Sequence, residues 1–154
     1  MSTVSERLTE LGIELPAAAP PAGLYNPAMV HGSVAYVSGQ VPSRDGELMY
    51  QGKVGAEVDV EPAQAAARQC VLNGLAALAM VLGSVDRVER IVKMTVFVAS
   101  APGFTAQPQV ANGASQVLID IFGMDQRPAR SAIGVAELPM GVPVEVELIA
   151  AISR

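Results

Sequence analysis

The C-terminal segment, residues 127–152, constrains the fold more strongly than any other part of the chain. Its sequence, RPARSAIGVAELPMGVPVEVELIAAI, contains two largely apolar runs separated by a Leu-Pro-Met-Gly turn, a pattern typical of two β-strands. We expect these strands to pair as an antiparallel hairpin over residues 129–152. Arg130 opens the first strand, and Glu145 and Glu147 lie in the second. Charged side chains in so apolar a hairpin either pair with one another or face a ligand.

The other segments alternate between strand-like and helix-like patterns. A capping box at Thr3 and Glu6 predicts a short N-terminal helix, and the proline-rich residues 16–23 predict an extended arm. Strands are expected at residues 25–30, 34–38, 47–51 and 88–99, and helices at residues 62–82 and 105–122.

This order of elements predicts an α+β fold in which one mixed sheet has two helices packed on one face. We expect a single domain of residues 25–154, preceded by the helix and arm of residues 1–24. The other face of the sheet would need a cover, and self-association would supply one.

The composition argues against several functional classes. The 154-residue chain carries 10 Lys and Arg against 15 Asp and Glu, a net charge of −5, and its basic residues are scattered, so no nucleic-acid partner is expected. One histidine and one cysteine cannot build a usual zinc site, so no metal is expected. Cys70 lies on the apolar stripe of the first long helix and is expected to be a small core residue rather than a nucleophile.

Two further patterns bear on location. The longest apolar region, residues 63–82, is interrupted by polar residues at helical spacing, which indicates a core helix and not a membrane span. We find no signal-like segment and no cysteine pair, which favours a cytoplasmic location.

The expected hairpin defines a candidate site. If the chain turns at Pro139-Met140, the numbers of paired residues sum to about 279, which places Arg130, Ala132, Glu145 and Glu147 on one face. Arg130 and Glu145 would then stand roughly 13 Å apart along the strands and could bracket a small ligand. A one-residue change of register would put them on opposite faces. The structural alternative is an ion pair for Arg130 and solvent-facing glutamates on an edge strand.

Several segments, taken in order, resemble the RidA/YjgF family, the reactive intermediate deaminases. They are Tyr25, VSGQVP at residues 37–42, VKMTVFV at residues 92–98 and PARSAIGVAELP…VEVELIA at residues 128–150. The resemblance covers about residues 25–152 and implies a chorismate-mutase-like fold assembled as a homotrimer with three clefts between subunits. The activity it implies is hydrolysis of enamine and imine intermediates, such as 2-aminoacrylate, to 2-oxo acids and ammonia without a cofactor.

The resemblance also implies roles for individual residues. Arg130 matches the arginine that grips the substrate carboxylate, and Glu145 matches the glutamate that holds the attacking water. Tyr25, Gly39 and Asn112 match substrate-binding residues of the cleft: an aromatic side chain, a backbone contact and a polar side chain.

Three positions depart from the family pattern. Ala132 stands where many deaminases have a cysteine that contributes mostly backbone groups to substrate binding, Ser115 replaces a frequent aromatic residue, and Arg127 precedes Pro128 where an aromatic residue is common. The small side chains of Ala132 and Ser115 predict a roomier cleft. The N-terminal helix resembles a separate, longer branch of the family.

Three functions therefore compete. The first is hydrolysis of 2-imino acids in the cleft, with Arg130 and Glu145 as catalytic residues. The second is a non-catalytic trimer that binds a small carboxylic acid, which would need Arg130 but not Glu145. The third, an endoribonuclease, is disfavoured by the acidic charge and by the absence of a histidine placed for acid–base chemistry. The expected partners are a small carboxylate or imine and further copies of this chain, with no membrane.

Overall fold

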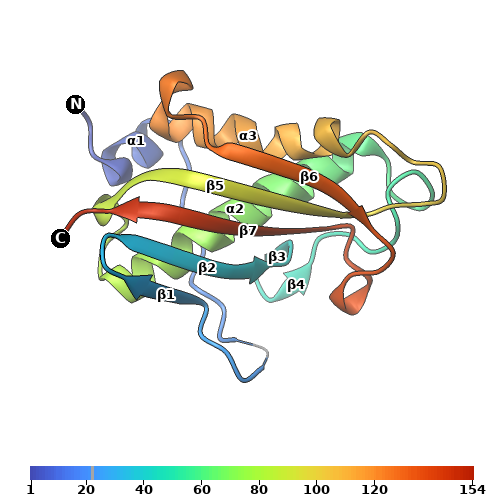
Figure 1. The fold of residues 1–154 in the computed structure, drawn as a ribbon, viewed down its shortest axis with the longest axis horizontal. Coiled ribbons are helices and arrows are strands. Elements are labelled where there is room, and N and C mark those ends of the chain that lie inside the picture. The colour runs from blue at the N-terminus through green and yellow to red at the C-terminus, as the bar shows by residue number, and fades with distance from the viewer. Residues whose placement is uncertain (22) are drawn as a thin grey trace.

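A computed structural model describes residues 1–21 and 23–154 and shows a five-stranded mixed sheet with two long helices behind it (Figure 1). Ala22, in the predicted arm, lies outside the described residues. The strand order is β1-β2-β7-β5-β6, with strands β1 (Ala28–His31), β2 (Val34–Gln40), β5 (Val88–Ala99), β6 (Ala129–Val135) and β7 (Val144–Ile152). Strands β3 (Ser43–Arg44) and β4 (Glu47–Leu48) form a separate small hairpin.

The helices begin and end where the local sequence predicts. Helix α1 (Val4–Glu10) carries the capping box, in which the Glu6 backbone N–H donates to Thr3 Oγ1 and the Thr3 N–H donates to Glu6 Oε2. Helix α2 (Val60–Leu82) is capped by Gly83, whose φ of 83° is the left-handed conformation that glycine adopts without strain. Helix α3 spans Gln107–Phe122, and three short 3₁₀ turns are η1 (Val85–Arg87), η2 (Met124–Gln126) and η3 (Pro139–Gly141).

Helix α2 is the central core element. By length and composition it could cross a membrane, yet most of it is packed inside the fold, which confirms the core-helix prediction. Cys70 is fully buried there, with its Sγ 3.8 Å from the Val144 carbonyl oxygen. Burial, and next the negative charge of Glu145, raise the pKa of the Cys70 thiol well above its ordinary value. The thiolate is therefore disfavoured, as expected for a structural cysteine.

The predicted C-terminal hairpin is wrong, although both of its strands exist. Strand β5 lies between β6 and β7, pairing parallel with β6 and antiparallel with β7. The cause is the segment order β5-α3-β6, because a strand, a crossover helix and a second strand favour parallel neighbours. The chain after β6 then passes the end of β5, where Ala99 N–H donates to the Pro143 carbonyl and Ser100 N–H donates to the Val135 carbonyl.

The observed pairing puts Arg130 and Glu145 on opposite faces of the sheet, which corrects the shared face predicted above. Arg130 is in register with Met94 of β5, which is fully buried on the helix side, whereas Glu145 is in register with Phe97. Since successive side chains of a strand alternate between faces, Met94 and Phe97 point to opposite sides. Ala132 shares the face of Arg130, and Glu147 shares the face of Glu145.

The sheet face opposite the helices carries exposed apolar side chains. Tyr36 is 49% exposed and Ile133 is 44% exposed, and both lie on this face by strand alternation. No described element of the chain packs across them. The face matches the expected need for a cover, and the homotrimer that would supply it stays a prediction.

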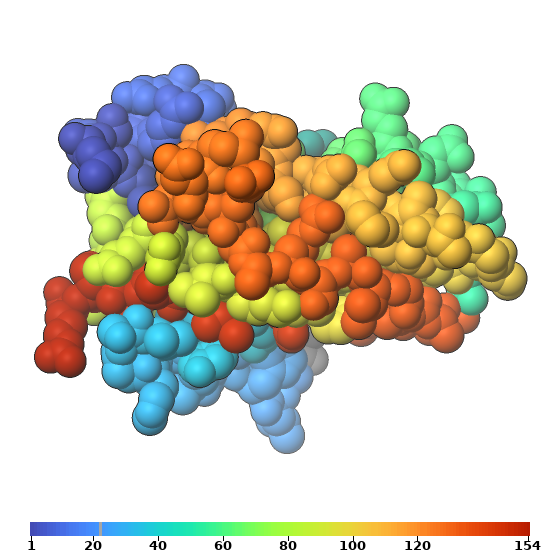
Figure 2. Space-filling model, turned by 45° about the horizontal axis from the view of Figure 1, so that its top comes forward, coloured from blue at the N-terminus to red at the C-terminus, as the bar shows by residue number. Residues whose placement is uncertain are grey.

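Side-chain hydrogen bonds attach helix α1 to the body, and one of them runs from Arg7 Nε to the Asp120 carbonyl of α3 at 2.8 Å. Asp86 of η1 accepts hydrogen bonds from the Ser5 backbone N–H at 2.7 Å and from the Ser5 hydroxyl at 2.8 Å, and these bonds lower the pKa of Asp86. Figure 2 shows α1 in blue beside the orange end of α3 and the yellow-green start of β5. The N-terminal segment is thus an attached part of the domain.

Helices α2 and α3 approach closely at Gly113. A Cβ at this position would meet the backbone carbonyl of Gln64, and a backbone atom cannot move aside as a side chain can. We expect Gly113→Ala to lower the free energy of unfolding by about 1–3 kcal/mol because of overpacking, as measured by urea denaturation. The exposed Gln109→Ala on the same helix should change it by less than about 0.5 kcal/mol. Equal effects of the two variants would contradict this packing argument.

Candidate functional site

The guanidinium of Arg130 is held on the helix side of the sheet by two side chains of α3. Its Nη1 donates to the amide oxygen of Asn112 at 2.9 Å and to the hydroxyl of Ser115 at 3.0 Å. Asn112 and Ser115 are three residues apart and therefore lie on one helix face. Together with Ile119, Arg127 and Pro128 these residues line a cavity of about 290 Å³. We call this group the arginine half-site.

Hydrogen bonds position the Arg130 guanidinium, but no negative charge neutralises it within the described residues. Among the residues that the structure describes, no carboxylate lies within salt-bridge distance of Arg130. Its two partners are neutral acceptors on one nitrogen, and a guanidinium has five N–H donors in a planar fork. The half-site is therefore suited to bidentate binding of a carboxylate, and within the described residues of one chain Arg130 does not form the ion pair of the structural alternative.

Glu145 lies in a different place, beside an irregularity between β2 and β7. The register of the two strands shifts by one residue between Val37 and Gln40, so Ser38 and Gly39 form a bulge, a feature common next to active sites. A Cβ on Gly39 would overlap the Glu145 carboxylate, so the absence of a side chain at position 39 makes room for that group. Glycine at position 39 thus allows the Glu145 carboxylate to approach the backbone of β2 closely.

The Glu145 carboxyl is partly withdrawn from water. Burial, and to a smaller extent the negative charge of Glu147, raise the pKa of Glu145 above its ordinary value. A carboxylate whose pKa lies closer to neutrality is a better proton acceptor than an ordinary glutamate. This electrostatic state fits general-base chemistry.

Glu145, Gly39 and Tyr25 line a common cavity of about 380 Å³. Further walls come from the N-terminal arm, from the β3–β4 hairpin and from η3. We call this group the glutamate half-site. The structure thus brings together Tyr25, Gly39 and Glu145, and separately Arg130 and Asn112.

The two half-sites of one chain cannot act on one small molecule. Arg130 and Glu145 are offset by three residues along β5, roughly 10 Å, and lie on strands at either side of β5, which adds about 10 Å. Their side chains also leave opposite faces of the sheet. Ala132 is on the Arg130 face but is partly buried against the core and does not line the cavity of the arginine half-site.

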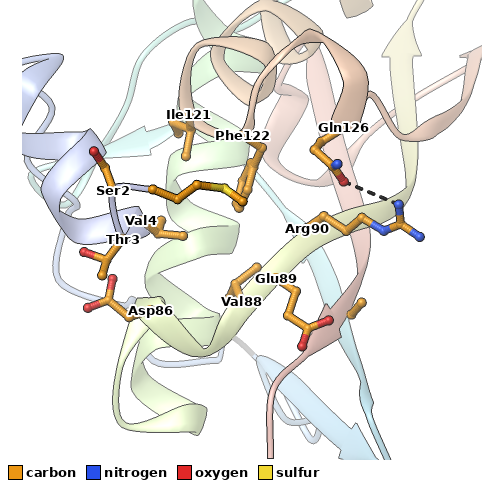
Figure 3. Close-up of a pocket in the computed structure, with 12 residues that line it drawn as sticks. Ser2, Thr3, Val4, Asp86, Val88, Glu89, Arg90, Ile121, Phe122 and Gln126 are labelled. Atoms are coloured by element: carbon orange, nitrogen blue, oxygen red, sulfur yellow. Dashed lines mark hydrogen bonds between the residues drawn. The ribbon is translucent and has the colours of Figure 1, made fainter.

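A larger cavity, of about 540 Å³, lies between the N-terminus, the start of β5 and the end of α3. In Figure 3, Arg90 reaches the amide oxygen of Gln126, 3.4 Å from its Nη1, while Glu89 points away from that pair. The charged groups here do not converge on one point, and the arrangement offers no geometry for catalysis.

Sequence reasoning missed two components of the half-sites. Ser115 was recognised only as a departure from the family pattern, although its spacing from Asn112 places both on one helix face toward Arg130. Pro139 and Met140, expected at a hairpin turn, line the cavity beside Glu145 instead. No sequence signal reveals the latter contact, because it follows from the position of β5 between β6 and β7.

Comparison with known proteins identifies the family. The family model described as Endoribonuclease L-PSP matches residues 16–152. The chain belongs to the RidA/YjgF family. This confirms the resemblance found in the sequence and extends it into the arm.

Three relatives show the spread of the family. Protein TCP17 of Trypanosoma cruzi is 46% identical over 147 residues, covering 95% of this chain and 92% of that protein. A 2-iminobutanoate/2-iminopropanoate deaminase of Dermatophagoides farinae is 30% identical over 142 residues, covering 91% and 94%. The mitochondrial protein mmf1 of Schizosaccharomyces pombe is 34% identical over 132 residues, covering 84% and 68%. Because that relative is mitochondrial, a cytoplasmic location for this chain stays a prediction.

Two solved structures confirm the α+β fold. A Shewanella oneidensis MR-1 protein superposes with a TM-score of 0.92 at 32% identity, covering 98% of this chain and all of that one. Escherichia coli TdcF, solved with bound serine, gives a TM-score of 0.62 at 29% identity, covering 90% and 94%. The nearly complete overlap with the Shewanella protein includes the N-terminal helix and arm, consistent with a longer branch of the family.

The pKa of Glu145 can be tested directly. Glu147→Gln removes the smaller of its two causes, so the pKa should fall yet stay above the ordinary value because burial is unchanged. Titration of the side-chain carboxyl carbons by NMR measures it. Glu89→Gln, an exposed change at the far end of β5, should leave the pKa of Glu145 unaltered. An ordinary pKa in the unmodified protein would contradict the assignment.

Proposed function

We propose that this protein hydrolyses 2-imino acids and their enamine tautomers to 2-oxo acids and ammonia. The observation that carries the proposal is the Arg130 guanidinium, held by Asn112 and Ser115 at 2.9 and 3.0 Å without a counter-charge. A substrate carboxylate supplies that counter-charge. The deaminase name of one relative and the serine bound to TdcF support a substrate of this class.

The proposed site joins the arginine half-site of one subunit to the glutamate half-site of another in a homotrimer. The support is geometric, because the two groups lie on opposite faces within one chain and the sheet face that bears Glu145 is uncovered. An assembly of identical chains can bring one face of a subunit against a different region of its neighbour. Tyr25, Gly39, Asn112 and the backbone groups of Ala132 complete the proposed cleft as substrate-binding residues.

The chemistry then needs little machinery. An enamine first takes a proton from solvent at its β-carbon to give the protonated imine. Water held by Glu145 adds to the carbon of the protonated imine and loses a proton to the carboxylate. The protonated Glu145 carboxyl then donates that proton to the nitrogen of the tetrahedral carbinolamine. The C–N bond breaks, ammonia leaves, and the hydroxyl gives its proton back to the Glu145 carboxylate as the carbonyl forms. Fixing the carboxylate at Arg130 places the imine carbon next to that water.

The roles of the two charged residues can be separated. Glu145→Gln should lower the rate of 2-oxo acid release about 10²–10⁴-fold, the usual contribution of a general base, while binding of pyruvate measured by calorimetry persists. Arg130→Ala should lose both the release of 2-oxo acid and the binding of pyruvate. The imines are generated in situ by a flavin amino-acid oxidase, and Glu89→Gln, an exposed change at the far end of β5, is the matched carboxylate control. Turnover that survives Glu145→Gln would refute the water-holding role.

If the unmodified protein binds pyruvate but accelerates no imine, the family member is a carboxylate-binding trimer. In that case Glu145→Gln would bind pyruvate as tightly as the unmodified protein. The two functions are therefore distinguished by the same set of proteins.

The shared site makes a second prediction. Arg130→Ala and Glu145→Gln chains are each inactive, but in mixed trimers some clefts combine the intact arginine of one chain with the intact glutamate of the other. Each mixed cyclic trimer has one cleft in which both groups are intact, so isolated mixed assemblies should show about a third of the unmodified activity. Co-expression with two affinity tags isolates the mixed assemblies. Inactive mixed assemblies would place both groups of a cleft in the same chain.

A further inference from the structure

The cavity beside Glu145 extends well beyond the carboxylate and is lined mainly by apolar groups, with Gln40 and Ser43 among its few polar side chains. Pro20 and Pro21 come from the arm, Leu48 from the β3–β4 hairpin, and Pro139 and Met140 from η3, facing Tyr25. These walls come from three segments that lie outside the five-stranded sheet. The part of the cavity away from Glu145 thus presents mostly carbon to a ligand.

Hydrogen bonds hold two of these walls in place. The η3 turn is tied to the segment after β4, because Gln51 Nε2 donates to the Met140 carbonyl and Gly52 N–H donates to the Gly141 carbonyl, both at 2.8 Å. The β3–β4 hairpin is tied to α2 by Asn73, whose Nδ2 donates to the Ser43 carbonyl at 2.9 Å. Walls fixed before ligand binding reduce the ordering cost of binding.

The size of the cavity exceeds what the smallest substrate needs. A water-sized group takes about 30 Å³, so the water on Glu145 and a methyl side chain would fill only a minor part of about 380 Å³. Cavities of this volume with apolar linings and few polar groups are typical sites for larger apolar ligands.

We infer that the walls at Leu48, Met140 and the arm form a side-chain pocket, which selects 2-imino acids with a branched or aromatic side chain over the alanine-derived imine. This inference rests on the proposed imine hydrolysis, since the reacting carbon would lie beside Glu145, which lines the same cavity. The selectivity arises because the larger side chain removes apolar surface from water in a pocket already formed. The small residues Ser115 and Ala132 are not its source, because Ser115 is engaged by Arg130 and Ala132 packs on the core.

The test compares kcat/KM for imines generated from alanine, leucine and phenylalanine. The unmodified protein should favour the leucine and phenylalanine imines about tenfold or more, the usual value of added apolar groups in a fitted pocket. Met140→Gln keeps the side-chain length but adds a polar amide, so it should bring that ratio toward one. Leu48→Gln, on a separate wall, should act in the same direction.

Met124→Gln is the matched control, because Met124 and Met140 are each 55% exposed and both lie in 3₁₀ turns. It should leave the ratio unaltered. A ratio near one in the unmodified protein, or equal changes in the Met140 and Met124 variants, would overturn the inference while leaving imine hydrolysis standing. If no imine is hydrolysed, the proposed function fails, and calorimetry still tests the pocket: 4-methyl-2-oxopentanoate should bind more tightly than pyruvate, and equal affinities would overturn the inference.

Discussion

The position of β5 between β6 and β7 determines how this protein can work. Parallel pairing with β6 sets Arg130 against Met94, and antiparallel pairing with β7 sets Glu145 against Phe97. Alternation along β5 then forces the two side chains to opposite faces. The residues that the family pattern links in one reaction are separated in one chain by the hydrogen-bond register of a single strand.

The two half-sites differ in the electrostatic state that each maintains. Neutral acceptors orient Arg130 and leave its charge available, at little desolvation cost because the side chain is exposed. Glu145 is partly buried beside the bulge at Gly39, and its pKa rises. The charge of Arg130 favours binding of a ligand carboxylate. The raised pKa of Glu145 favours transfer of a proton from water to its carboxylate. Each half-site is therefore suited to one part of an imine hydrolysis.

The sequence predicted the elements far better than their pairing. Local signals are strong at the capping box of Thr3 and Glu6, at Gly83, and in the β-branched run of β5, and the observed ends follow them closely. The pairing of β6 was missed because the Leu-Pro-Met-Gly turn is compatible both with a hairpin and with a crossing past β5. The charges in the apolar C-terminal segment singled out Arg130 and Glu145, and the family resemblance added their roles and the other cleft residues. The predicted shared face depended on strand register, and an error of one residue or one strand in the pairing moves a side chain to the opposite face. The contact of Met140 with the Glu145 cavity depends on tertiary pairing and has no local signal.

A site divided between subunits would make activity depend on assembly. A single chain has an arginine without a counter-charge, a partly buried glutamate and an uncovered sheet face. Association would bring the arginine and the glutamate of different subunits into one cleft, and it would cover the apolar surface of the sheet. Activity would then fall with protein concentration below the dissociation range of the assembly. The arm and the β3–β4 hairpin contribute only to the glutamate half-site. Changes in these segments can therefore alter which side chain is accepted while the carboxylate anchor on α3 and β6 stays the same.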